Sequence, residues 1–234
     1  RGLMKNAIGH ELCPELMKGL GIELRTEETK KDTATLQQRL QKNGKLLGSL
    51  EEAIKAAGLK DGMTISFHHH FRDGDYVLND VMKKISEMGY KDITVASSSL
   101  SNAHGPLVQY IKDGTVTALQ SSGCRGKLAD AISKCEVELK QPVIFRSHGG
   151  RASAIANGTL HIDIAFLGVA SCDALGNASG TNESGESMCG SLGYAMADAR
   201  YAKHVVIITD NLVPYPLQDW SISEIDVDTV VTVD

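Results

Sequence analysis

The sequence has few aromatic residues and no long run of apolar residues. Aromatic side chains make up 5% of the 234 residues, so the core must be built mainly from Val, Ile, Leu and Ala. Apolar runs such as residues 205–208 are far shorter than the ~20 residues of a membrane-spanning helix. The first residues also lack the apolar segment of a secretory signal peptide. These absences predict a cytoplasmic protein that does not enter a membrane.

Cysteine is scarce, and its spacing excludes two common uses. The 5 cysteines form no C-x-x-C pair, and an odd count fits neither a disulfide framework nor a zinc ribbon. Cys172 and Cys189 have no histidine beside them in the sequence, so we interpret both as buried structural thiols rather than nucleophiles.

Positive charge is also in short supply. There are 24 Lys and Arg residues against 29 Asp and Glu, a formal net charge of -5, and the basic residues are scattered along the chain. A protein that binds a phosphate backbone normally gathers its basic side chains into a patch or stripe. The sequence therefore predicts no binding of nucleic acid.

Glycine is abundant, with 23 residues, and short apolar runs alternate with helix-like segments from residue 49 onward. This alternation is typical of an α/β fold: a mainly parallel sheet with helices on both faces. Ser49 is a good N-cap for the first helix, because Glu51 and Glu52 follow in its first turn. The predicted strands are 63–67, 93–96, 116–119, 143–146, 162–167 and 205–209, and the predicted helices are 50–57, 76–88, 106–112, 126–134, a short one from 152, and 188–202.

The pattern divides the chain into two parts. Residues 1–48 are rich in Lys, Glu and Gln, and glycines interrupt any long period, which predicts a partly helical N-terminal extension. Residues 49–234 form one α/β domain in this interpretation. The chain opens without Met, and residues 227–234 alternate like an unfinished strand, so we expect a fragment of a longer protein.

Small, hydroxylic and histidine residues follow the predicted strands. In open α/β sheets the ligand sits beyond the carboxyl ends of the strands, so these segments are the candidates for a functional site. They are residues 66–70, 97–99, 121–123, 147–151 and 168–173.

Three consecutive histidines, His68, His69 and His70, end the first of these strands. In an extended chain His68 and His70 would share one face about 7 Å apart, and a metal would need a third ligand, for which His148 is the best candidate. The histidines also fit a polar role in a site, or packing at the surface. A metal-dependent hydrolase built on His68, His70 and His148 remains an alternative function, although we expect no metal.

The segment 147–151 reads Ser-His-Gly-Gly-Arg and lies between a predicted strand and a helix. Gly149 and Gly150 would let backbone N–H groups approach an anion, and Arg151 could make a bidentate fork to a carboxylate. The other interpretation is a tight turn with a solvated arginine. Neither this segment nor 123–127 matches the phosphate-binding loop G-x-x-x-x-G-K-[ST], so an ATP site is unsupported.

The stretch 168–193 is rich in Gly, Ser and Asn and has no apolar period. A loop of this length inside a compact domain is usually functional, and it could shape a pocket for a pantetheine arm or an oxyanion. A surface excursion without function is the alternative.

Six sequence segments, in order, closely resemble the citrate lyase alpha subunit family. The resemblance covers about residues 50–220 and rests on residues 61–69, 96–101, 147–151, 162–178, 189–195 and 212–216. It implies a CoA-transferase-like α/β fold, of which this chain would supply the first domain and lack the second. The implied reaction exchanges acetate for citrate on the thiol of a CoA-like group, which gives a citryl thioester. A ligand-binding regulatory module of the same fold is a further alternative.

The resemblance also implies partners and site residues. Acetyl-CoA, or the CoA-like prosthetic group of an acyl-carrier (gamma) subunit, would be the substrate with citrate, and no cofactor would be bound covalently here. A lyase (beta) subunit would cleave the product, and an oligomer is expected. Related CoA-transferases use a glutamate nucleophile from their second half, and no such role passes to Glu183 or Glu186. The predicted catalytic residues are His68, His69, Ser98 and His148, and the predicted substrate-binding residues are Arg72, Gly149, Gly150, Arg151, Ser171 and Asn177.

Overall fold

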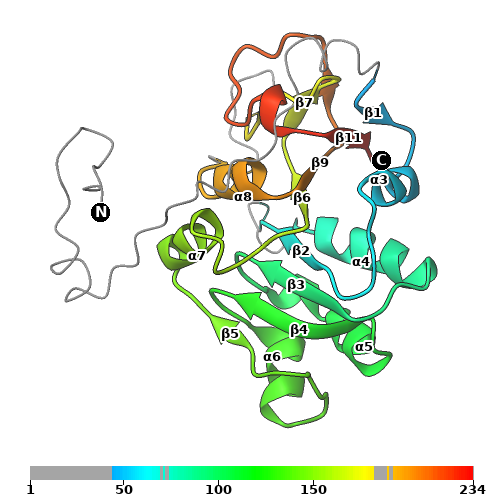
Figure 1. Cartoon of the computed structure of the whole chain (residues 1–234), viewed down its shortest axis with the longest axis vertical. Helices are drawn as coiled ribbons and strands as arrows, with labels where there is room; N and C mark the ends of the chain where they lie inside the picture. The colour runs from blue at the N-terminus through cyan, green and yellow to red at the C-terminus, as the bar shows by residue number, and fades with distance from the viewer. Residues whose placement is uncertain (1–43, 69–70, 72–73, 182–188, 190–191, 234) are drawn as a thin grey trace, which may run out of the picture. The chain divides into compact units, whose positions relative to one another are not determined.

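A single eight-stranded parallel sheet organises the domain. The computed structural model describes residues 44–68, 71, 74–181, 189 and 192–233. The sheet strands are β1 (Leu46–Leu47), β2 (Thr64–Phe67), β3 (Ile93–Ser97), β4 (Val116–Ser121), β5 (Ile144–Phe145), β6 (Ile164–Gly168), β9 (His204–Thr209) and β11 (Thr229–Thr232). Their order is β1-β11-β9-β6-β2-β3-β4-β5, and every neighbouring pair is parallel (Figure 1). The predicted parallel sheet is confirmed.

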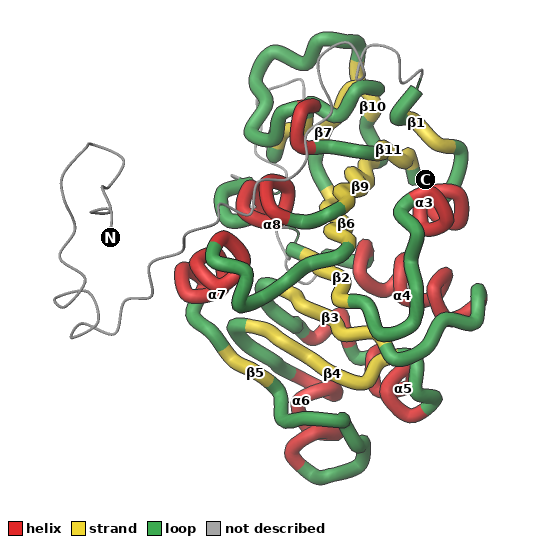
Figure 2. The backbone as a smooth tube through the Cα atoms, viewed as in Figure 1, coloured by secondary structure: helices red, strands yellow, loops and turns green. Residues whose placement is uncertain are grey.

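Helices cover both faces of this sheet. They are α3 (Leu50–Ala56), α4 (Val77–Glu87), α5 (Leu107–Lys112), α6 (Gly126–Ser133), α7 (His148–Ala156) and α8 (Ala195–Tyr201), with short 3₁₀ helices at Asn102–His104 and Glu224–Asp226. The apolar residues of α3 to α6 belong to one buried cluster, and those of α7 and α8 to another. Figure 2 shows α7 and α8 side by side, away from α4, α5 and α6.

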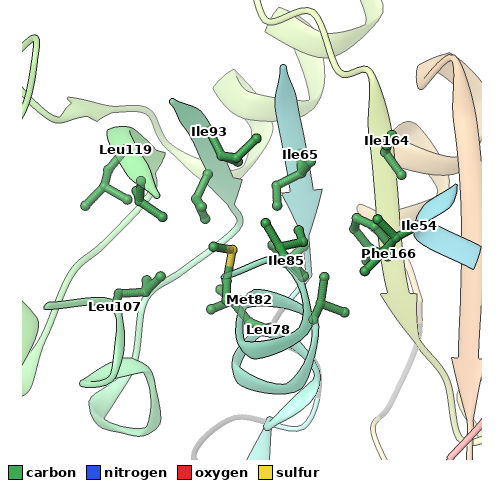
Figure 3. Close-up of a cluster of buried hydrophobic side chains, with 14 of the residues drawn as sticks. Ile54, Ile65, Leu78, Met82, Ile85, Ile93, Leu107, Leu119, Ile164 and Phe166 are labelled. Atoms are coloured by element: carbon green, nitrogen blue, oxygen red, sulfur yellow. The ribbon is translucent and has the colours of Figure 1, made fainter. Parts of the chain in front are cut away.

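Alternation along the central strands separates the two clusters. In β6, Ile164 and Phe166 join the first cluster, whereas Ala165 and Leu167 join the second, because successive strand residues point to opposite faces. On the first face, Leu78, Met82 and Ile85 of α4 recur with helical spacing and pack toward the strands (Figure 3). A continuous apolar strand sequence therefore indicates burial on both sides here. Among the helices of the described residues, none is long and apolar enough to span a membrane.

The predicted start of the first helix is also confirmed. The Ser49 side chain accepts a hydrogen bond from the Glu52 N–H at 3.2 Å, and the Glu52 carboxylate accepts from the Gly48 N–H at 2.9 Å. These bonds satisfy donors that a helix leaves without intrahelical partners. The helix ends one residue earlier than predicted, at Ala56.

Several short elements were not predicted. A second sheet consists of β7 (Ser171–Asp173), β8 (Ala178–Ser179) and β10 (Leu212–Val213), and its strands β7 and β8 lie in the stretch interpreted as a loop. Strand β1 lies within the expected extension 1–48 and pairs with β11, Leu46 opposite Val230. Elements of two or three residues are too short to show a period, and the partners of β1 and β10 are distant in the sequence.

Two helix boundaries were wrong. Helix α7 begins at His148 rather than at residue 152, because Ser147 acts as its N-cap. Helix α8 begins at Ala195 rather than at residue 188. Residue 188 lies outside the described residues, while residues 192–194 are described and not helical.

Gly176 is expected to tolerate no side chain. Its φ of +102° is a conformation that residues with a Cβ rarely adopt, and an added Cβ would lie 2.6 Å from Val227 Cγ1. We expect Gly176→Ala to lower the free energy of unfolding by about 3 kcal/mol in urea titration, combining backbone strain with overpacking. Gly114→Ala is the control: φ is +78°, but no described atom would lie within 4 Å of its Cβ. Gly114→Ala should lower the free energy of unfolding by about 1 kcal/mol. Equal losses in the two variants would contradict the packing argument.

Candidate functional site

The carboxyl ends of β2, β3, β4 and β5 meet at one edge of the sheet and are joined there by hydrogen bonds. The Ser98 N–H donates to Phe67 O at 3.1 Å, and the Ser122 N–H donates to Ser98 O at 3.4 Å. Ser122 Oγ donates to the same Ser98 oxygen and lies 3.2 Å from His148 Nδ1. Two predicted catalytic residues, Ser98 and His148, are therefore brought together through Ser122.

Tyr194 covers the start of α7 beside this edge. Its ring stacks on the His148 ring with centroids 6.2 Å apart and planes 13° apart. A Cβ added at Gly149 would lie 3.8 Å from Tyr194 Oη, so a larger residue there would approach the phenol. Sequence reasoning placed Ser122 in the candidate segment 121–123 without assigning it a role, and it did not single out Tyr194. Ser122 was within reach because it directly follows β4, whereas nothing local marks Tyr194.

The segment Ser-His-Gly-Gly-Arg forms the first turn of α7, not a turn ahead of it. The Ser147 side chain accepts a hydrogen bond from the Gly150 N–H at 3.0 Å, and a Cβ at Gly150 would meet Ser147 Oγ at 2.9 Å. Gly150 therefore has a role in capping. His148 and Gly149 occupy the first helical positions, where backbone N–H groups point out of the helix end.

Arg151 differs from both interpretations of the sequence. The residue is only 3% exposed, and Nη1 and Nη2 donate to the two carboxylate oxygens of Asp198 at 2.8 and 2.6 Å. Nη2 also donates to Ala96 O at 3.0 Å. The guanidinium is thus neither solvated nor directed at a substrate carboxylate. Its predicted role in binding substrate directly is not supported by this geometry.

Ser171 and Asn177, also predicted to bind substrate, are both buried, Ser171 in β7 and Asn177 directly before β8. Ser171 Oγ donates to Thr181 O at 2.7 Å. Asn177 Nδ2 donates to Asp173 Oδ2 at 2.8 Å and to Glu224 Oε2 at 3.1 Å, and Asn177 Oδ1 accepts from the Glu224 N–H. The Asn177 bonds connect the turn between β7 and β8 to the 3₁₀ helix at Glu224–Asp226, and the Ser171 bond stays within the 171–181 segment. The geometry therefore favours a structural role for both residues.

The histidine segment is described only in part. His68 follows β2 and is partly buried, with both ring nitrogens shielded from solvent. His69, His70 and Arg72 lie outside the described residues, so their predicted roles stay predictions. Within the part of the chain that the structure describes, no group of three or more His, Cys, Asp or Glu residues is arranged to hold a metal ion.

Burial shifts the pKa of an acid and of two thiols near this end of the sheet. The Asp75 carboxyl precedes α4 and is 3% exposed, and burial raises its pKa to about 7, against the opposing effect of a hydrogen bond from the Val77 N–H. Burial also raises the pKa of Cys189 to about 11 and of Cys172 to about 12. Both thiols are therefore protonated at neutral pH, which supports their interpretation as structural rather than nucleophilic.

The sequence is similar to those of citrate lyase alpha chains. The family model described as "Citrate lyase, alpha subunit" matches residues 43–234. The citrate lyase alpha chain of Haemophilus influenzae is 55% identical over 84% of this chain, and that of Escherichia coli is 52% identical over 86%. Each match covers 38% of the relative's own length, so the chain spans less than half of these proteins.

Solved structures agree on the fold. A crystal structure described as the alpha subunit of citrate lyase from Streptococcus mutans, in complex with citrate, has a TM-score of 0.83 and 49% identity and covers 98% of this chain and 45% of its own. Glutaconate coenzyme A-transferase from Acidaminococcus fermentans, at 12% identity and a TM-score of 0.55, shares the fold over 80% of this chain and 75% of its own. The CoA-transferase-like fold is therefore confirmed, and the chain belongs to the citrate lyase alpha subunit family.

Proposed function

We propose that this chain carries part of the transferase site that exchanges acetate for citrate on a thioester. The observation that carries the proposal is the joining of Ser98, Ser122, His148 and Tyr194 at one edge of a parallel sheet, in a chain of this family. The Streptococcus mutans relative is described in complex with citrate, which supports citrate as the acyl acceptor here. The alternative of a metal-dependent hydrolase is not favoured, because the family is one of acyl transfer.

The proposed reaction needs no covalent bond to the protein. A citrate carboxylate attacks the acetyl thioester carbonyl, the C–S bond breaks, and the thiolate departs. The product of this step is an acetyl-citryl anhydride. The thiolate then attacks the citryl carbonyl, a new C–S bond forms and acetate leaves. Each attack places negative charge on a carbonyl oxygen, and fixed donors near that oxygen stabilise it by about 3 kcal/mol each.

His148 is the residue best placed to act in these steps. Its ring is held by Ser122 Oγ at Nδ1 and by the Tyr194 ring on one face, so the direction of Nε2 is fixed. A ring with a set orientation can meet a carboxylate or a developing oxyanion without first giving up freedom of rotation. Ser98 acts through its backbone carbonyl, which holds Ser122 in place.

The rest of the site would come from the remainder of the subunit and its partners. The chain spans 38% of the length of its curated relatives, so a second domain would complete the site. The thioester would be acetyl-CoA or the CoA-like group of the acyl-carrier subunit, and the lyase subunit would receive the citryl thioester. Localisation to the cytoplasm and oligomerisation are parts of this proposal.

The test is acyl transfer from acetyl-CoA to citrate by the full-length subunit. We expect His148→Gln to lower turnover about 100-fold, because the imidazole acts on the reacting groups. His161→Gln is the matched control: this exposed histidine lies ahead of β6, at the opposite end of the strand, and its replacement should leave turnover unchanged.

Two outcomes would count against the proposal. A folded His148→Gln subunit with wild-type turnover would remove His148 from the mechanism. No transfer by the folded wild-type subunit would favour the ligand-binding module instead.

A further inference from the structure

The starts of α7 and α8 touch each other in two layers. In the exposed layer, the rings of His148 and Tyr194 stack. In the buried layer, Arg151 forms its bidentate ion pair with Asp198. Residues three or four apart lie on one face of a helix, so residues 148 and 151 of α7 face residues 194 and 198 at the start of α8. The ion pair and the stack are therefore adjacent parts of a single helix–helix contact.

The same guanidinium also connects α7 to the strand end beneath it. Arg151 donates to the carbonyl of Ala96, which lies two residues before Ser98 in β3 and its extension. The Ser98 carbonyl holds Ser122, and Ser122 in turn contacts His148. From His148, the first turn of α7 leads back to Arg151. Arg151, residues 96–98, Ser122 and His148 are thus connected in a ring of contacts. His148 is held by Ser122 on one side and by the helix that Arg151 anchors on the other.

The ion pair contributes little to the free energy of unfolding, but it can fix the alignment of α7 against α8. Its side chains are 4% and 0% exposed, and removing two charges from water offsets most of their mutual attraction. Apolar residues around it, including Ala154, Ile155 and Ala199, already supply the packing between the helices and the sheet. The planar Arg151 guanidinium, by contrast, can donate two parallel hydrogen bonds to a carboxylate in one orientation only. The pair therefore selects one alignment of the two helices.

We propose that Asp198 and Arg151 are positioning residues that set α7 against α8 and β3 and so hold His148 at the strand edge. This inference rests on the proposed function, in which His148 acts on the reacting groups. It replaces direct contact between Arg151 and citrate with an indirect role, and it gives Asp198, which the sequence did not single out, a part in the site.

The first test measures the His148 ring itself, without any activity. In ¹H–¹³C spectra of this chain, the His148 ring signal is identified by its loss in His148→Gln, and Tyr194→Leu gives its position without stacking. We expect Asp198→Asn to move the signal toward its position in Tyr194→Leu. Ile85→Ala removes buried side-chain atoms from α4 on the opposite face of the sheet, and it should leave the signal unmoved.

This measurement distinguishes a positioning role from a purely structural one. If Asp198→Asn lowers the unfolding midpoint as Ile85→Ala does and leaves the His148 signal at its wild-type position, the proposal is wrong. Arg151→Lys, which keeps the charge and loses the fork, carries the same test if Asp198→Asn does not fold. A signal unmoved in that variant would also overturn the proposal.

The second test uses acetyl-CoA-to-citrate transfer by the full-length subunit. A positioning residue that does not touch citrate should change kcat, so we expect Arg151→Lys to lower kcat about 10- to 100-fold with KM for citrate within about twofold. A rise in KM with unchanged kcat would instead indicate direct contact with citrate and overturn the inference. If the wild-type subunit shows no transfer, the proposed function fails, and the His148 signal still decides the positioning role.

Discussion

Replacing Asp173 with alanine is expected to lower the free energy of unfolding by about 5 kcal/mol, the largest loss among the substitutions considered. The Asp173 carboxylate is fully buried and organises the turn between β7 and β8. Oδ1 accepts from the N–H groups of Leu175, Gly176 and Asn177, and Oδ2 accepts from Asn177 Nδ2 and the Leu217 N–H. Alanine would remove the acceptor of the Leu175, Asn177 and Leu217 N–H groups, at about 1–3 kcal/mol each before relaxation. The Gly176 N–H keeps the Asp173 backbone carbonyl, and Asn177 Nδ2 keeps Glu224 Oε2.

Urea unfolding followed by circular dichroism measures this loss. Asp219→Ala is the matched control, because Asp219 is an exposed aspartate two residues after Leu217, and its removal should change stability by less than about 0.5 kcal/mol. Asp173→Asn keeps one acceptor oxygen, so its loss of unfolding free energy should lie between those of Asp173→Ala and Asp219→Ala. A loss below about 1 kcal/mol for Asp173→Ala would show that water or local rearrangement satisfies these donors.

Asp75→Asn is expected to stabilise the protein at pH 8 by about 4 kcal/mol and to leave its stability at pH 4 nearly unchanged. Burial raises the pKa of the Asp75 carboxyl from 3.8 to about 7, while the hydrogen bond from the Val77 N–H opposes the shift. Asparagine keeps an oxygen for that N–H and carries no charge. The variant therefore avoids the burial of a carboxylate.

The stabilisation by Asp75→Asn should increase with pH because the folded protein binds the Asp75 proton more tightly than the unfolded chain does. Between pH 4 and pH 7 the folded protein keeps the Asp75 proton, whereas the unfolded chain has lost it. The contribution of Asp75 to stability is thus complete below pH 4, declines as the pH rises toward 7, and is lost above that. The advantage of Asp75→Asn should grow over the same interval and level off near pH 8.

The measured quantity is the difference in unfolding free energy between variant and wild type at each pH. Taking the difference removes the titration of the other carboxylates, which both proteins share. Asp80→Asn, the same exchange at an exposed carboxylate in the first turn of α4, should retain the wild-type decline with pH. An Asp75→Asn curve parallel to that of the wild type would show that Asp75 is ionised in the folded protein throughout this range.

The sequence predicted most of the regular structure because its signals are local. The spacing of Leu78, Met82 and Ile85 indicates a helix, and the run at residues 205–208 indicates a strand buried on both sides. Ser49 marks a helix start within four residues of chain. Patterns of this length also located the strand ends, so Ser98 and His148 could be selected before their proximity was known.

The predictions from sequence fail where the structure of a segment depends on a partner that is distant in the chain. Strand β1 exists because Leu46 meets Val230, and β10 because Leu212 meets Cys172. Two-residue strands carry no period, so only the paired chain reveals them. The start of α7 was placed too late because the two glycines resemble a turn, although Ser147 caps them into the helix.

By itself the sequence determined the parallel α/β architecture, the edge at which a site would form, and the residue types gathered there. Only the tertiary structure shows which of those side chains lie together at the strand edge and which are bonded to other parts of the fold. Arg151 illustrates the reason: a guanidinium after a strand has the same local sequence whether it meets a substrate or Asp198, which lies 47 residues away. Local periodicity determines the course of the backbone, but the role of a charged side chain depends on the group that folding brings beside it.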